Sequence, residues 1–128
     1  MPYQLEWYKP EQILYLELSG QPTIQELKQV NQEVNHILDL HQRKMILLMD
    51  ATGFSAGYYS ANYLRETQTY VNHEYLGDVL VVSDNKLTRL ITLLAFSLSR
   101  ANFSQHSSMA LAEKALQRMG FRPDERVS

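Results

Sequence analysis

Short hydrophobic stretches, some alternating with polar residues and some continuous, predict the strands of this chain. Residues 3–8 and 13–20 alternate and are separated by a short turn, which favours an antiparallel pair. Residues 44–51 and 77–84 contain continuous apolar runs, at 45–49 and 79–82, which are typical of central strands covered on both faces. Residues 102–107 are a candidate for a short strand at the edge of the sheet.

Apolar residues three and four positions apart predict helices. Four stretches have this spacing: 23–42, Ser60 to about Tyr75, 85–101 and 108–120. Thr23 and Glu26 have the spacing of a capping box at the start of the first helix. The resulting order is β-β-α-β-α-β-α-(β)-α. We therefore expect an α/β protein with a single mixed, largely parallel sheet of four to five strands and helices packed on it. It would form one domain over residues 1–128, with a polar tail at 121–128.

The helix predicted over residues 85–101 has two faces of different character. An advance of about 100° per residue places six apolar residues on the face that we expect to contact the core: Leu87, Leu90, Ile91, Leu94, Leu98 and Ala101. Phe96 points nearly opposite to that face, flanked by Arg89 and Arg100. Because arginine and aromatic residues concentrate at interfaces, Arg89, Leu93, Phe96 and Arg100 are a candidate interaction surface. The alternative is a solitary exposed ring, or one covered by the C-terminal helix.

Composition limits the classes of function. The 128 residues suit one domain with its own core, and a net charge of −2 gives no basic excess that would indicate nucleic acid. With no cysteine, disulfides, thiolate metal sites and a cysteine nucleophile are excluded. The polar N-terminal stretch is not a secretory signal, and no apolar run approaches the roughly 20 residues that span a membrane. We expect a cytoplasmic protein without a membrane span and without a cofactor.

Two predicted parallel strands end in an aspartate, Asp50 and Asp84. Ligands of open α/β sheets bind beyond the carboxyl ends of such strands. Further polar and aromatic residues would lie close to this rim: Thr52, Ser55, Tyr58, Tyr59, Ser83 and Asn85. The two carboxylates could perform acid/base chemistry or hold a divalent cation. Alternatively, each caps a helix or closes a turn by accepting hydrogen bonds from nearby amides.

Five of the eight tyrosines lie between Tyr58 and Tyr75. Tyr59, Tyr63 and Tyr70 could line a pocket for an apolar or ring-containing ligand, form a protein interface, or fill the layer between helix and sheet. The four histidines form no metal-binding motif, so no metal site is expected. Walker, G-x-G-x-x-G and G-x-S-x-G motifs are absent from the sequence, so no motif supports a kinase, dinucleotide or hydrolase function.

The stretches "LELSGQPT", "LLMDATGFS", "VLVVSDN" and "FSQHSSMALAEKAL" occur in an order that resembles the STAS fold. The resemblance is to anti-sigma factor antagonists and the related SpoIIAA-like group. It implies a non-enzymatic domain that binds another protein or, in some relatives, a small ligand. It also implies a serine that a partner kinase phosphorylates. Here Asp50, Thr52 and Gly53 fit the first part of the D-x-S-G … D-S-S-G pattern. Ser60 falls near the switch serine, without its acid and glycine, and is equally suited to cap a helix.

Three hypotheses follow. The first is a non-catalytic, regulatory protein–protein interaction module of STAS type, binding a protein partner or associating with itself. The second is a binder of a small apolar or acyl ligand in a tyrosine-lined pocket at the strand rim. The third is an enzyme that uses Asp50 and Asp84.

Overall fold

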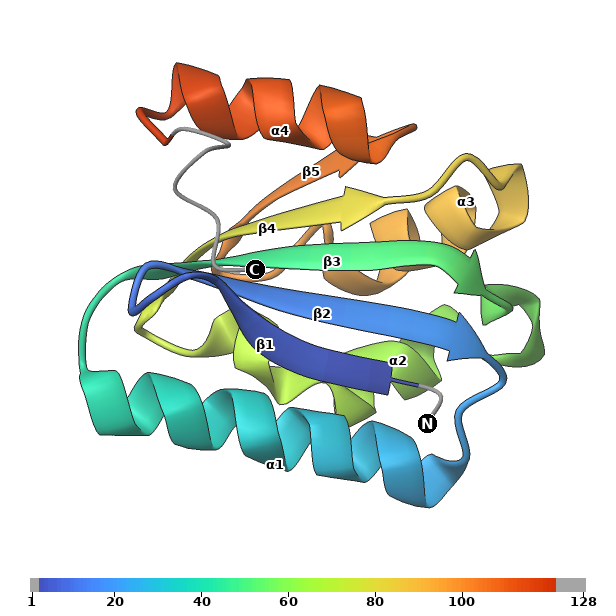
Figure 1. Cartoon of the computed structure of the whole chain (residues 1–128). Helices are drawn as coiled ribbons and strands as arrows, with labels where there is room; N and C mark the ends of the chain where they lie inside the picture. Colours follow the sequence, from blue (N-terminus) through green and yellow to red (C-terminus); the bar gives the residue numbers. More distant parts are fainter. Residues whose placement is uncertain (1–2, 122–128) are drawn as a thin grey trace.

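The computed structural model of the chain describes residues 3–121. Within them lies one five-stranded mixed sheet with four α-helices, which confirms the predicted α/β class. The strands lie side by side in chain order (Figure 1): β1 (Tyr3–Lys9), β2 (Ile13–Gly20), β3 (Met45–Phe54), β4 (Leu76–Val82) and β5 (Asn102–His106). β1 is antiparallel to β2, as predicted, and the other neighbours are parallel. Of the predicted tail, only Phe121 belongs to the described residues.

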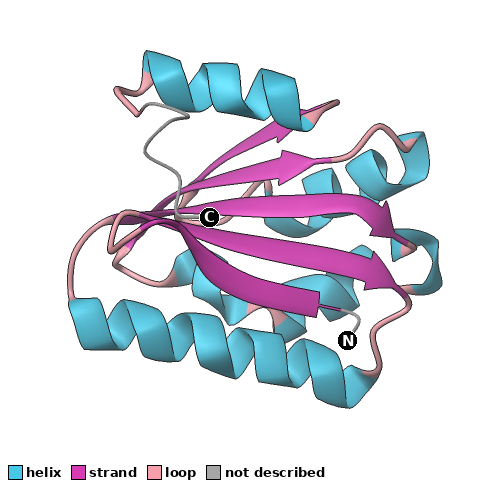
Figure 2. Cartoon of the chain, in the orientation of Figure 1, coloured by secondary structure: helices cyan, strands magenta, loops and turns pink. Residues whose placement is uncertain are grey.

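Helices cover both faces of the sheet (Figure 2). They are α1 (Ile24–His41), α2 (Ala61–Thr67), α3 (Lys86–Phe96) and α4 (Met109–Arg118), with short 3₁₀ helices η1 (Ala56–Tyr58) and η2 (Thr69–Asn72). Right-handed crossovers between parallel strands in chain order place α1, α2 and α3 on one face. There they bury the larger apolar core, whereas α4 closes a smaller one on the opposite face. None of the helices within residues 3–121 combines the length and hydrophobicity needed to traverse a lipid bilayer.

Local sequence signals determine where α1 begins. The Thr23 hydroxyl accepts a hydrogen bond from the Glu26 amide at 3.1 Å, and the Glu26 carboxylate accepts one from the Thr23 amide at 2.9 Å. The predicted capping box is therefore confirmed. The buried residues of α1 lie three and four positions apart, as a helix on a sheet requires: Leu27, Val30, Val34 and Leu38.

The helix predicted from Ser60 is shorter than its apolar pattern suggests. α2 ends at Thr67, because Gln68 has φ −109° and ψ 70°, outside the helical region. Asn31 of α1 favours this break. Its side-chain oxygen accepts hydrogen bonds from the Thr69 amide at 2.7 Å and from the next amide at 3.3 Å, so that η2 starts as a separate element.

The structure contradicts the predicted orientation of α3. Phe96 is buried, with 2% of its surface exposed, and packs edge-on against Phe103 with ring centroids 6.2 Å apart. The buried residues of α3 are Thr88, Thr92, Ala95 and Phe96. Four of the residues predicted to contact the core are instead exposed: Leu87, Leu90, Leu94 and Leu98. Ile91 is half-buried, and Ala101, beyond the helix, is buried as predicted.

Buried threonines explain this orientation. The Thr92 hydroxyl donates to the carbonyl of Thr88 at 2.9 Å, and the Thr88 hydroxyl donates to the carbonyl of Phe54 at 3.3 Å. Both polar groups are thus satisfied inside the core, which removes the penalty of burying them. The Gln105 side chain adds a bond to the Thr92 hydroxyl at 3.0 Å, which ties α3 to β5. Both faces of α3 have the three- and four-residue spacing of a buried helix face: the exposed leucines on one side, and Thr88, Thr92, Ala95 and Phe96 on the other. Spacing alone therefore does not show which face is buried.

We expect Phe96→Ala to destabilise the protein strongly and Leu94→Ala to have little effect. Loss of a buried phenylalanine ring costs about 3–5 kcal/mol, whereas exposed positions change stability by about 0.5 kcal/mol or less. Urea unfolding followed by circular dichroism measures both free energies. Equal losses for the two variants would contradict the observed orientation of α3.

Candidate functional site

The predicted rim lies at the carboxyl ends of β3 and β4, where Asp50 pairs with Val82 in the strand register. One carboxylate oxygen of Asp50 accepts hydrogen bonds from the Thr52 amide at 3.1 Å and the Thr52 hydroxyl at 2.7 Å. The other accepts one from the Tyr15 hydroxyl at 2.9 Å. Burial raises the pKa of Tyr15, and the Asp50 and Glu17 carboxylates raise it further. β3 continues to Phe54, so Asp50 does not end the strand as predicted. Its carboxylate supports the irregular part of the β2–β3 pairing and a buried tyrosine.

The other strand end forms the start of α3. Asp84 is exposed, and it is the neighbouring Asn85 whose side chain caps α3 by accepting a bond from the Thr88 amide at 2.9 Å. Ser83 is fully buried, and its hydroxyl oxygen accepts a bond from the Asn85 amide at 3.1 Å. Ser83 and Asn85 thus have structural roles that Asp84 does not share.

A surface hollow of about 330 Å³ opens between the end of β3, η1 and the start of α3. We call it the rim hollow; it is lined by Thr52, Gly53, Phe54, Ser55, Ala56, Gly57, Asn85, Leu87 and Thr88. The predicted rim residues in this lining are Thr52, Ser55 and Asn85. The structure therefore brings part of the predicted rim together, around a recess whose far wall is a leucine.

The tyrosines near the rim pack against one another and against the core. The Tyr59 ring stacks between Phe54 and Tyr63, at centroid distances of 5.6 and 6.2 Å, and its hydroxyl donates to the carbonyl of Pro22. Tyr70 is completely buried, and burial raises its pKa. The cavity beside Tyr70 measures about 10 Å³, room for about one water molecule. The tyrosines fill the interior there; the side chain of Tyr58 lies outside the described part of the chain.

Ser60 is the N-cap of α2. Its hydroxyl oxygen accepts a hydrogen bond from the Tyr63 amide at 3.0 Å, and the residue is exposed. The alternative that Ser60 caps a helix is thus confirmed. Phosphorylation of the same residue, which the STAS resemblance implies, stays a prediction.

Five leucines of α3 and the turn after it are exposed to solvent. We call them the leucine face: Leu87, Leu90, Leu93, Leu94 and Leu98. Between 41% and 91% of each residue's surface is exposed. Of the interaction surface predicted on this helix, Leu93 and Arg100 are exposed, Arg89 is half-exposed and Phe96 is in the core. The sequence predicts a core position for Leu87, Leu90, Leu94 and Leu98, because their stripe is the more apolar of two with equal spacing.

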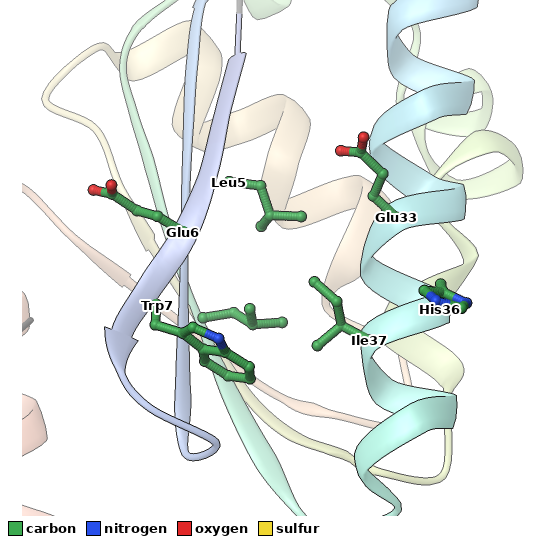
Figure 3. Close-up of a pocket in the computed structure, with 7 residues that line it drawn as sticks. Leu5, Glu6, Trp7, Glu33, His36 and Ile37 are labelled. Atoms are coloured by element: carbon green, nitrogen blue, oxygen red, sulfur yellow. The ribbon is translucent and has the colours of Figure 1, made fainter.

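A second apolar surface lies at the opposite edge of the sheet. This β1–α1 groove has a volume of about 360 Å³ and is lined by Leu5, Glu6, Trp7, Leu14, Glu33, His36 and Ile37. Figure 3 shows Leu5 and Trp7 of β1 pointing toward Ile37 of α1, with Glu33 at the end nearer Leu5. Glu6 points to the other side of the strand. No sequence pattern predicts this groove, because it arises between two elements whose facing residues are far apart in the chain.

Within residues 3–121, no three histidine or acidic side chains come close enough to hold a metal ion. Compared with protein-family models, curated proteins and solved structures, the chain matches none. The rim hollow, the leucine face and the β1–α1 groove are three surfaces of residues 3–121 where apolar side chains are accessible to a partner or a ligand.

We expect Ser60→Ala to lower the free energy of unfolding by about 1 kcal/mol, because the alanine cannot accept the Tyr63 amide bond. Ser60→Asp should stay close to wild type, since aspartate is an equally good cap and its charge is favourable at a helix N-terminus. Thermal unfolding measures both, with Ser107→Ala as the control at an exposed serine that is not the N-cap of a helix. A loss for Ser60→Asp as large as that for Ser60→Ala would show that capping is not the role of this side chain.

Proposed function

We propose that this chain is a non-catalytic, regulatory protein–protein interaction module of STAS type that works in the cytoplasm and binds through the leucine face of α3. The observation that carries the proposal is the exposure of five leucines on one short helix and the turn after it. Burying a leucine side chain is worth about 1.5–3 kcal/mol. A cluster of this kind left in water is the usual mark of a binding surface.

The rim supports a non-catalytic role. The Asp50 carboxylate accepts three hydrogen bonds from Thr52 and Tyr15, which leaves it poorly placed for acid/base chemistry. Asp84 is exposed, beside a capped helix. The resemblance to the STAS fold points in the same direction, since domains of that family act by binding.

We expect the double substitution Leu90→Glu/Leu94→Glu to abolish partner binding and to leave the fold intact. Both side chains are about half exposed, so charge is tolerated there in the free protein, whereas a charge buried in an interface is strongly unfavourable. Quantitative mass spectrometry of complexes isolated from the native cells would compare wild type with the variant. Unfolding curves of the purified proteins would show that the fold is unchanged.

The matched control is Leu40→Glu/Leu111→Glu, which adds the same two charges at exposed leucines on α1 and α4, 67% and 45% of whose surfaces are accessible. It should retain every complex that the wild type forms. If the α3 variant also retained them all, the leucine face would not be the binding surface.

A second candidate function is the binding of a small apolar ligand, with the site in the β1–α1 groove in place of a tyrosine-lined pocket. The groove has a ligand-sized volume and an apolar lining of Leu5, Trp7, Leu14 and Ile37. The Glu33 carboxylate at one end would repel the carboxylate of a fatty acid. The groove therefore suits a neutral or cationic chain better than an anionic one.

The single tryptophan of the protein, Trp7, lies in this groove, so its fluorescence reports on occupancy. We expect dodecyltrimethylammonium, below its micelle concentration, to shift the Trp7 emission to shorter wavelength, and laurate to do so at least about tenfold more weakly, a difference of about 1.4 kcal/mol. Ile37→Phe should fill the groove and suppress the shift. Ile24→Phe, on the same helix at a position 58% exposed, should not. An unshifted emission in the wild type would exclude the groove as a ligand site.

A further inference from the structure

The leucine face and the rim hollow form one continuous surface, because Leu87 belongs to both. Gly57 of η1 lies directly against it: a Cβ atom at Gly57 would come within 2.7 Å of a Leu87 methyl group. The absence of a side chain at Gly57 thus lets Leu87 form the wall of the hollow. The combined surface is an apolar stripe that ends in a recess.

The spacing of the stripe fits a helical partner. Leu87, Leu90, Leu94 and Leu98 are separated by three, four and four residues, so they follow one line along α3 and the turn after it. An amphipathic helix docks on such a line with its own apolar residues at positions i, i+3, i+4 and i+7. The recess beside Leu87 can then accept one larger side chain of the partner.

The charges on α3 itself are basic, whereas exposed carboxylates lie just before the helix at Asp84 and on α2 at Glu66. The charged residues from position 86 to 100 are Lys86, Arg89 and Arg100, although the whole chain has a net charge of −2. On the flank formed by α2, Arg65 donates hydrogen bonds to the carbonyls of Leu94 and Ala95 and so adds a cation at the C-terminal end of α3.

This charge pattern selects among the occupants that an apolar stripe could have. A second copy of the chain would bring two basic rims together, which is unfavourable in a symmetric interface. An anionic bilayer would satisfy the cations, but a lipid surface offers no rigid side chain that matches the hollow. An acidic helix satisfies the stripe, the cations and the hollow together.

We propose that the leucine face and the rim hollow bind one acidic amphipathic helix of a partner protein, with its apolar side chains on the leucines, one of them in the hollow, and its carboxylates opposite Lys86, Arg89 and Arg65. This inference rests on the proposed function, whose binding surface it uses, and adds the chemical class of the partner.

The test uses three synthetic helical peptides with the same leucine stripe and with glutamate, lysine or glutamine on the polar face. Fluorescence anisotropy measures their binding to the purified full-length protein. We expect the glutamate peptide to bind at least about tenfold more tightly than the lysine peptide, and its affinity to fall as salt is added. Anionic vesicles of phosphatidylglycerol and sedimentation of the protein alone test the other two occupants.

Variants assign the interaction to its parts. Leu90→Glu/Leu94→Glu should abolish binding of the glutamate peptide, and Ser55→Phe, which fills the hollow, should weaken it about tenfold. Lys86→Glu/Arg89→Glu should reverse the preference toward the lysine peptide. The matched control, Lys28→Glu/Lys114→Glu, makes the same change in net charge at exposed positions on α1 and α4 and should bind as the wild type does.

Three peptide results would overturn the inference: equal or tighter binding of the lysine peptide, an unchanged affinity of Ser55→Phe for the glutamate peptide, or no binding of any probe. Tighter binding of vesicles than of the glutamate peptide would also overturn it. So would a dimer of the wild-type protein that the leucine substitutions dissociate. Suppose that Leu90→Glu/Leu94→Glu abolishes a dimer, or binding that is equally strong for all three peptides. In that case the leucine face is still the binding surface, and only the acidic character of the partner is wrong. If that double substitution changes no association at all, in these measurements or in cells, the proposed function falls as well.

Discussion

The space between α3 and the sheet is the constraint on which the surface of this protein depends. Thr88, Thr92 and Ala95 are small enough to let the helix approach the strands, and Phe96 fills the remaining volume. A helix rotated by half a turn would force leucines into the space that threonine and alanine now occupy, at the cost of overpacking. It would also break the bonds that join the two threonine hydroxyls to the Phe54 carbonyl and the Gln105 side chain. The leucines are exposed because the opposite face of α3, which carries the threonines, Ala95 and Phe96, fits the space above the sheet.

Features determined by neighbours in sequence could be predicted from sequence. The strands follow from period-two alternation or from continuous apolar runs, and α1 begins where Thr23 and Glu26 form their capping box. The same holds for part of the rim. A structural role for Asp50 is one example: its carboxylate accepts a bond from the amide of Thr52, two residues later, as an aspartate side chain readily does. In the capping box and at Asp50, the hydrogen-bond partners lie within three residues of one another.

Features that depend on distant partners could not be predicted in this way. Asn31 of α1 determines where α2 gives way to η2, and Gln105 of β5 helps to determine which face of α3 is buried. Both faces of α3 have helical spacing, and the prediction that the more apolar face contacts the core is wrong. The β1–α1 groove has the same origin, because its walls come from residues about thirty positions apart. Packing volume and hydrogen-bond satisfaction, which decide these features, are properties of the assembled core.

The two apolar surfaces of the molecule lie at opposite edges of one sheet. The β1–α1 groove lies along the edge strand β1, whereas the leucine face lies on the helix that connects β4 to β5, the other edge. An occupant of one surface therefore does not cover the other. The interior between them is closed: the described cavity beside Tyr70 accommodates about one water molecule. A packed core fixes the backbone of α1 and α3. Under the proposed function, an occupant of either surface would therefore mainly have to order exposed side chains, at about 0.5–1.5 kcal/mol for each.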